Sequence, residues 1–70
     1  MKIRIEKGTD YWHLYLNDEQ IGCSSFNDIM KRVEALFRIA EEKFPTKLKA
    51  GCNEIRVKVG NIEFEMKGGC

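Results

Sequence analysis

The 70-residue sequence has one histidine, one proline and no long hydrophobic run. It contains none of the spacings typical of serine hydrolases, zinc proteases, P-loop proteins or dinucleotide-binding enzymes. Because the chain has a single histidine and none of these spacings, we expect a protein that is not an enzyme. The lack of an apolar stretch long enough for a signal peptide or a membrane span predicts a soluble, cytoplasmic protein without a membrane partner.

Neither sign of charge is in excess. Twelve Lys and Arg oppose eleven Asp and Glu, which leaves a formal net charge of +1. The chain therefore lacks the broad positive field of a protein that binds duplex nucleic acid, and any basic site must be local. One local basic patch lies in a segment without acidic residues from 43 to 53 and consists of Lys43, Lys47 and Lys49. It is a candidate contact for phosphate or an acidic partner, although such lysines are more often solvated loop residues.

Cysteine is scarce and irregularly spaced, with no Cys-x-x-Cys pair among Cys23, Cys52 and Cys70. The odd number and the wide spacing argue against the disulfide framework of a small secreted domain. Structural zinc sites draw their ligands from closely spaced pairs, so these thiols and His13 predict neither a metal site nor a cofactor. We expect Cys70 to be a free thiol on a flexible tail over 68–70.

Alternating apolar and polar residues predict the first part of a sheet. The stretch KIRIE at 2–6 and the residues that follow the first glycine place apolar side chains at every second position, which predicts a hairpin over 2–16. If residues 8–9 form a two-residue turn, Ile5 lies opposite Trp12.

A second turn at 18–19 would add a short third strand over 20–23. This register sets Leu14 opposite Cys23 and therefore buries the thiol. His13 would lie on the other face, so the two side chains would point apart.

A helix is predicted over 26–44. Ser25 is a good N-cap, and Asp28 three residues later forms an acidic variant of the capping box. Apolar residues then recur at helical spacing and form one stripe: Phe26, Ile29, Met30, Val33, Phe37, Ala40 and Phe44. Pro45 ends the helix, because the residue before a proline is driven out of the helical region.

The clearest hairpin spans 54–67, where EIRVKV and IEFEMK flank a two-residue turn at 60–61. One side of this hairpin carries three apolar pairs: Ile55 with Met66, Val57 with Phe64, and Val59 with Ile62. The other side carries three pairs of opposite charge: Glu54 with Lys67, Arg56 with Glu65, and Lys58 with Glu63. The charged side is suited to water.

These elements predict a single α+β domain over 1–70, in the order strand, strand, optional strand, helix, strand, strand. One helix covers one face of an antiparallel sheet of four or five strands, and the other face is open to solvent. Antiparallel neighbours throughout give the strand order 3-2-1-5-4, and a mixed order with the first strand parallel to the fourth is the alternative. So short a chain has a marginal core, which favours a homodimer.

The open face carries the main candidate binding site. Three ring-bearing side chains project from it at period two: Tyr11, His13 and Tyr15. The expected register places three charged residues opposite them, in the order Glu6, Arg4 and Lys2. Tyr and Arg are enriched among binding hot spots. Tyrosine also has a high intrinsic propensity for strands, so a row of surface rings without a function is an equally good interpretation.

One edge of the helix is a second candidate surface. Spacing of i, i+4, i+7 and i+11 joins Arg32, Leu36, Ile39 and Lys43. This arrangement directs Ile39 away from the sheet, where it could contact a partner.

The sequence thus predicts a small non-enzymatic module that binds a protein by occupying a surface of a larger macromolecule. In size and make-up the chain resembles the accessory and inhibitor proteins carried by phages and other mobile elements, including inhibitors of host defence. The alternative is single-stranded RNA binding, with rings stacked on bases and with Arg4 and Lys2 on phosphates. Glutamates on the same face would repel a phosphate backbone, so a protein partner ranks first.

Overall fold

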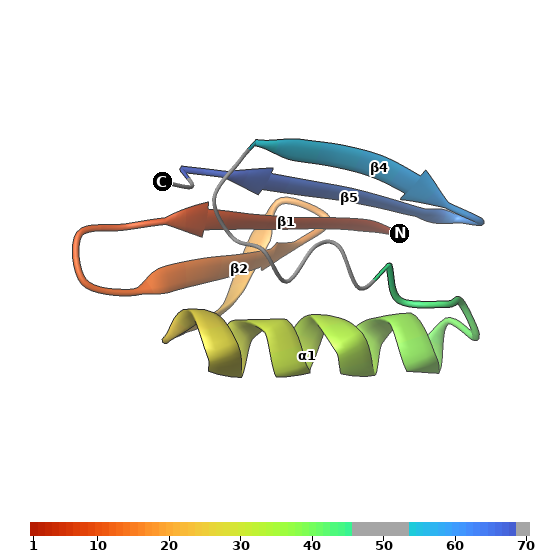
Figure 1. Cartoon of the computed structure of the whole chain (residues 1–70), viewed down its shortest axis with the longest axis horizontal. Coiled ribbons are helices and arrows are strands. Elements are labelled where there is room, and N and C mark those ends of the chain that lie inside the picture. The colour runs from red at the N-terminus through yellow and green to blue at the C-terminus, as the bar shows by residue number, and fades with distance from the viewer. Residues whose placement is uncertain (46–53, 69–70) are drawn as a thin grey trace.

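One helix and five strands make up the part of the chain that the computed structural model describes, residues 1–45 and 54–68. In chain order these elements are β1 (Lys2–Lys7), β2 (Trp12–Leu16), β3 (Glu19–Ser24), α1 (Phe26–Ile39), β4 (Ile55–Val59) and β5 (Ile62–Lys67). Figure 1 shows α1 packed along one face of the sheet. Among these residues, no helix has the length and apolar character needed to cross a membrane.

The sheet has the predicted order, β3-β2-β1-β5-β4. The central strand β1 and its neighbour β5 are parallel, whereas all the other neighbours are antiparallel. The expectation of a wholly antiparallel sheet is therefore wrong at this one pair, and the mixed alternative named the wrong partner for β1. Alternation of apolar and polar residues is the same in parallel and antiparallel strands, so it carries no information about direction.

The register of the first hairpin differs from the prediction by two residues. Ile5 lies opposite Leu14 instead of Trp12, because a four-residue loop replaces the two-residue turn. The Gly8 N–H donates to the Tyr11 carbonyl over 2.7 Å and closes this loop. A shift of two residues keeps every side chain on its predicted face, so the apolar set still points at the core.

The second turn lies at Asn17 and Asp18, one residue earlier than predicted. Both residues have positive φ, 50° and 68°, as a type I′ turn requires, and Asn and Asp tolerate this region better than most residues. A bulge then shifts the pairing between β2 and β3, with Leu14 opposite Gly22 and Tyr15 opposite Gln20. The predicted pairing of Leu14 with Cys23 is therefore wrong.

The helix begins as predicted and ends five residues earlier. The Ser25 hydroxyl accepts a hydrogen bond from the Asp28 N–H at 3.3 Å. At the other end Glu41 adopts φ 59°, with its N–H bonded to the Arg38 carbonyl, and the next N–H bonds to the Phe37 carbonyl. This is a Schellman motif, which stops the helix before Pro45.

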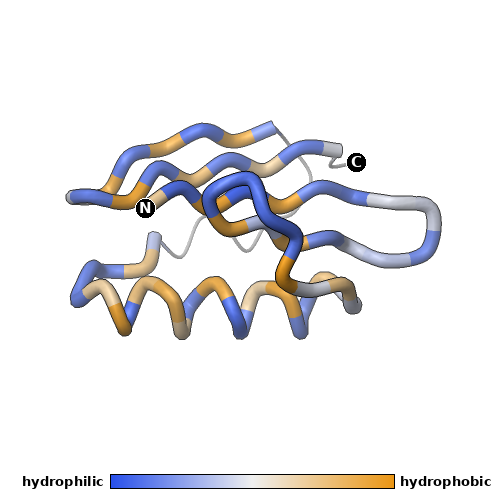
Figure 2. Tube along the Cα trace, turned by 180° about the vertical axis from the view of Figure 1, so that it is seen from behind, coloured by the Kyte–Doolittle hydropathy of each residue, from blue (hydrophilic) through white to orange (hydrophobic). Residues whose placement is uncertain are grey.

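The core lies between α1 and the covered face of the sheet. Its buried side chains are Ile3, Ile5, Trp12, Leu14, Ile29, Met30, Val33, Phe37, Ile62, Phe64 and Met66. Figure 2 shows the hydrophobic positions alternating with polar ones along the strands. Phe44 still reaches the core beyond the helix end, with its ring centroid 5.3 Å from that of Phe37.

The predicted register of the β4 and β5 hairpin is confirmed from Ile55 to Met66.

Candidate binding surface on the open sheet face

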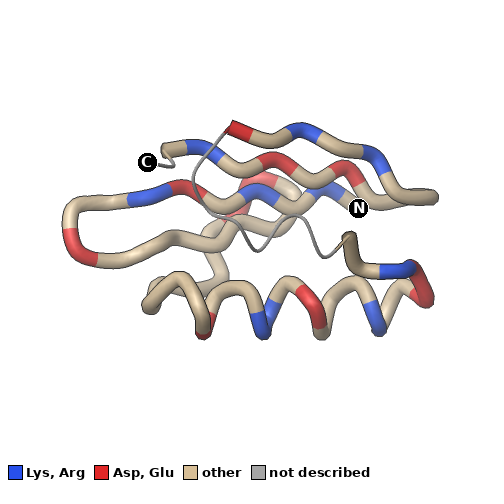
Figure 3. The backbone as a smooth tube through the Cα atoms, in the orientation of Figure 1, with Lys and Arg blue, Asp and Glu red and all other residues tan. Residues whose placement is uncertain are grey.

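Residues directly opposite one another in a sheet share a face, so the open face consists of rows that cross the strands. The central row runs through Gln20, Tyr15, Arg4, Glu65 and Arg56. On one side of it lie Cys23, His13, Glu6 and Lys67, and on the other side lie Lys2, Glu63 and Lys58. Figure 3 shows positive and negative residues intermixed on these strands. The open face is thus a mosaic of both signs.

Arg4 is held at the centre of this mosaic. Its guanidinium carbon lies 4.4 Å from the centroid of the Tyr15 ring, a cation–π contact. Its Nε lies 3.4 Å from Glu6 Oε2 and its Nη1 lies 3.9 Å from Asp18 Oδ1. Nε is hidden from solvent and has no hydrogen bond, so the contact with Glu6 is electrostatic. Only 24% of the Arg4 side chain is exposed, so these contacts enclose most of it.

Glu65 is the carboxylate of the central row, and only 17% of its side chain is exposed. Its Oε1 lies 3.2 Å from Arg56 Nη2 and 3.3 Å from Lys67 Nζ. Burial raises the pKa of this carboxyl, but the hydrogen bonds and positive charges of Lys67 and Arg56 outweigh burial, so the pKa lies below its ordinary value. Glu65 therefore joins β5 to the edge strand as an anion.

His13 and Cys23 are opposite one another, and both belong to the open face. The expectation that their side chains point apart is wrong, because the bulge moves the predicted partner of Leu14 from Cys23 to Gly22. The His13 Nδ1 lies 3.0 Å from Gln20 Nε2, and because an amide nitrogen donates, Nδ1 accepts. The described residues contain no group of three His, Cys, Asp or Glu side chains that could hold a metal ion.

The other two members of the predicted face are separated from its centre. Tyr11 precedes β2, in the loop that joins it to β1, and is 57% exposed. Lys2 pairs with Asp18 at 3.6 Å beside the β2 and β3 turn. Within the predicted face, the described structure therefore places Arg4 in direct contact with Tyr15 and with Glu6.

The helix edge is shorter than predicted. Ile39 is 74% exposed, and Leu36 is half-buried against the core. Arg32 lies against β3, since a Cβ on Gly22 would be only 2.7 Å from its Nη1. Lys43 is exposed but lies after the end of α1, so it does not continue the helical row. The rest of the predicted basic patch, Lys47 and Lys49, lies outside the described residues.

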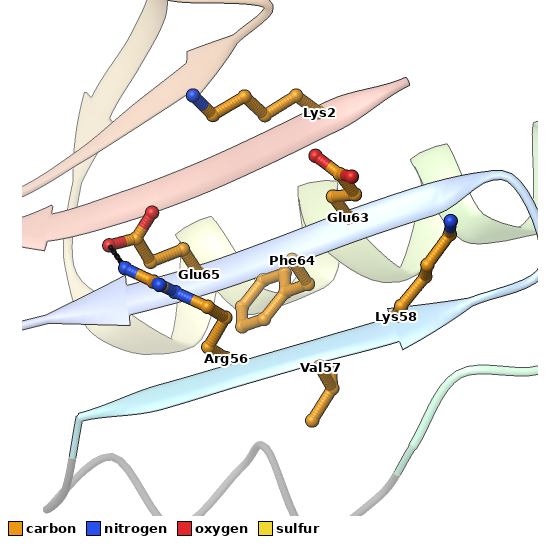
Figure 4. A pocket seen from close by; sticks show the side chains of 7 residues that line it. All are labelled: Lys2, Arg56, Val57, Lys58, Glu63, Phe64 and Glu65. Carbon is orange, nitrogen blue, oxygen red and sulfur yellow. Dashed lines mark hydrogen bonds and ion pairs between the residues drawn. The ribbon is translucent and has the colours of Figure 1, made fainter.

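The sequence reasoning missed a shallow groove of about 530 Å³ beside β4 (Figure 4). Its lining residues are Lys2, Arg56, Val57, Lys58, Glu63, Phe64 and Glu65. A second hollow, of about 300 Å³, continues along the same hairpin at Arg56 and Lys67. The sequence signal for this groove was the pair of cations at alternate positions of β4, Arg56 and Lys58.

Comparisons of the chain with protein-family models, with curated proteins and with solved structures found no match. The function proposed below therefore rests on the chemistry of the surface itself.

Proposed function

We propose that this protein is a non-enzymatic module that binds a protein partner through its open sheet face, centred on Arg4 and Tyr15. The observation that carries the proposal is the orientation of Arg4, which is held against the Tyr15 ring and beside two carboxylates before any partner arrives. A pre-oriented Arg and Tyr pair loses little side-chain entropy on binding, and these residue types dominate interface hot spots.

The charge pattern favours protein over nucleic acid. Glu65 and Glu6 lie beside the cations of the same face, and Arg4 covers one side of the Tyr15 ring that a base would need for stacking. A mosaic of both signs suits a protein surface with the complementary mosaic. RNA binding is therefore the second candidate, supported by Arg56 and Lys58 on the same face.

The proposed mode of action is occupation of a surface on a larger macromolecule in the cytoplasm, in the manner of a small accessory or inhibitor protein such as an inhibitor of host defence. The support for this mode is the size and make-up of the chain. Such a protein acts by steric exclusion and needs no chemistry of its own.

Site-specific photo-crosslinking in the native cell tests the proposal. A benzophenone amino acid at position 20, on the open face, should trap one protein, whereas the same probe at position 35 on the exposed side of α1 should not. Tyr15→Ala should reduce the binding free energy for the protein identified in this way by about 2 kcal/mol, the usual cost at a hot spot. Lys31→Ala, an exposed helix variant, is the matched control.

Two results would contradict the proposed site. Crosslinks that form only from position 35 would move the binding surface to the helix. Crosslinks from position 20 that ribonuclease removes, with a steep dependence on salt, would establish RNA as the partner.

A further inference from the structure

Of the two edges of the sheet, β4 is the more regular. β3 is interrupted by the bulge opposite Leu14 and Tyr15 and by Gly22. β4 pairs with β5 along its whole length without a bulge, and no strand of the described residues pairs with its other side. A regular edge strand presents a row of free backbone groups that can accept another strand.

The pairing pattern identifies which backbone groups these are. The two-residue turn makes Val59 and Ile62 a hydrogen-bonded pair, and such pairs alternate along an antiparallel ladder. The backbone groups of Val57 and Ile55 therefore also point toward β5. Those of Arg56 and Lys58 point away from the sheet, toward any strand that docks.

The same two residues supply positive charge beside this free edge. The Arg56 side chain is 83% exposed, and its contact with Glu65 through Nη2 leaves further guanidinium donors open. Lys58 is exposed and forms no ion pair within the described part of the chain. Both line the groove of about 530 Å³ on the open face.

A second copy of this chain is a poor occupant. The two-fold register that pairs all five residues of β4 with another β4 is centred on Val57. It sets Arg56 of one copy opposite Lys58 of the other, and it does so twice. Like charges directly opposite one another destabilise a pair of strands.

We propose that the β4 edge docks an extended acidic segment of a partner protein, antiparallel to β4. The segment alternates carboxylates, which face Arg56 and Lys58, with aliphatic side chains that extend the covered face. β5 already meets β4 in this way, with Glu65 opposite Arg56 and Glu63 opposite Lys58. This site uses neither Arg4 nor Tyr15, so it stands independently of the function proposed above.

Titration of the whole protein with the capped peptide Thr-Val-Glu-Val-Glu-Val-Thr, followed by NMR, tests the proposal. The peptide should slow hydrogen exchange at the backbone amides of Arg56 and Lys58. Replacement of both residues by Gln should weaken binding roughly fivefold, as expected for two exposed ion pairs. Lys31→Gln, which removes one positive charge from the exposed side of α1, should leave binding unchanged.

Other outcomes would overturn the proposal. One is equal affinity for the peptide in which both Glu are replaced by Lys. Another is slowed exchange at β3, or peptide binding without slowed exchange at β4. An oligouridylate that displaces the peptide from the same two residues would assign the site to phosphate. Arg4→Ala and Tyr15→Ala should not change peptide affinity, so this site and the open-face site fail or succeed separately.

Discussion

The Glu42 carboxylate accepts a hydrogen bond from the backbone N–H of Asn61 over 3.2 Å, joining the segment after α1 to the turn between β4 and β5. The amino group of Met1 donates to the carbonyl of the same Asn61 at 2.9 Å. Three parts of the chain that are remote in sequence therefore meet at one two-residue turn. A defect at this turn should loosen all three.

Gly60→Ala tests this connection. Gly60 has φ +56°, and an added Cβ would overlap the Glu42 carboxylate. We expect a loss of about 1–2 kcal/mol from the backbone conformation, plus about 1 kcal/mol for the displaced hydrogen bond, measured by chemical denaturation. In a Glu42→Ala background the cost should fall to the backbone part alone. An equal cost in both backgrounds would show that Glu42 does not stabilise the turn.

Glu41→Gly should stabilise the protein. Glu41 occupies the left-handed position that ends α1, at φ 59°, where a side chain costs about 1 kcal/mol relative to glycine. The midpoint of denaturation should rise without a change in its slope. Glu41→Ala is the control, because it removes the charge and retains the Cβ. A similar gain from alanine would assign the effect to charge.

Trp12 and the open-face rings should respond in opposite ways to truncation. The Trp12 ring is buried, 4.9 Å from the ring centroid of Phe26, so Trp12→Ala should cost about 3–5 kcal/mol in unfolding free energy. Joint replacement of Tyr11, His13 and Tyr15 by Ala should cost only about 0.2–1 kcal/mol per cross-strand pair, and it should abolish partner binding. A folded triple variant that binds normally would refute the open-face site.

Stability should depend on the ionisation of Glu65. The folded pKa lies below the ordinary value of 4.5, so the carboxylate stabilises the fold above that pH, and the contribution is lost as the pH falls through the folded pKa. The difference in unfolding free energy between wild type and Glu65→Gln should therefore be constant near neutral pH and vanish in acid. Joint replacement of Arg56 and Lys67 by Gln should remove most of this pH dependence. If the pH dependence persists in that double variant, a titrating group other than Glu65 causes it.

A homodimer is expected on grounds of size, since a core built from a chain this short has little stability in reserve. Light scattering in reductant at micromolar concentration measures it. Dimers that appear only without reductant would be disulfide-linked through Cys70, which lies outside the described residues, and Cys70→Ser would remove them. A monomer at every concentration would contradict the expectation.

Much of this architecture could be read from local patterns. The alternation in residues 54–67 predicted the β4 and β5 register, because a two-residue turn leaves only one way to pair the apolar side chains. Ser25 predicted the start of α1, because a cap acts on backbone groups within its own turn. The division of β1 and β2 into buried and open faces also held, since period two survives a register shift of two residues.

Other features depend on contacts between distant residues. The parallel pairing of β1 with β5 follows from where the chain enters the sheet after α1, which no local period records. The bulge in β3 sets Cys23 opposite His13 and Gly22 opposite Leu14, and an added Cβ on Gly22 would come within 2.7 Å of Arg32 Nη1 on α1, a contact that no local period records. The contact of Arg4 with Tyr15 required the true hairpin register. Periodicity specifies which face a side chain occupies, and packing between elements selects its neighbour on that face.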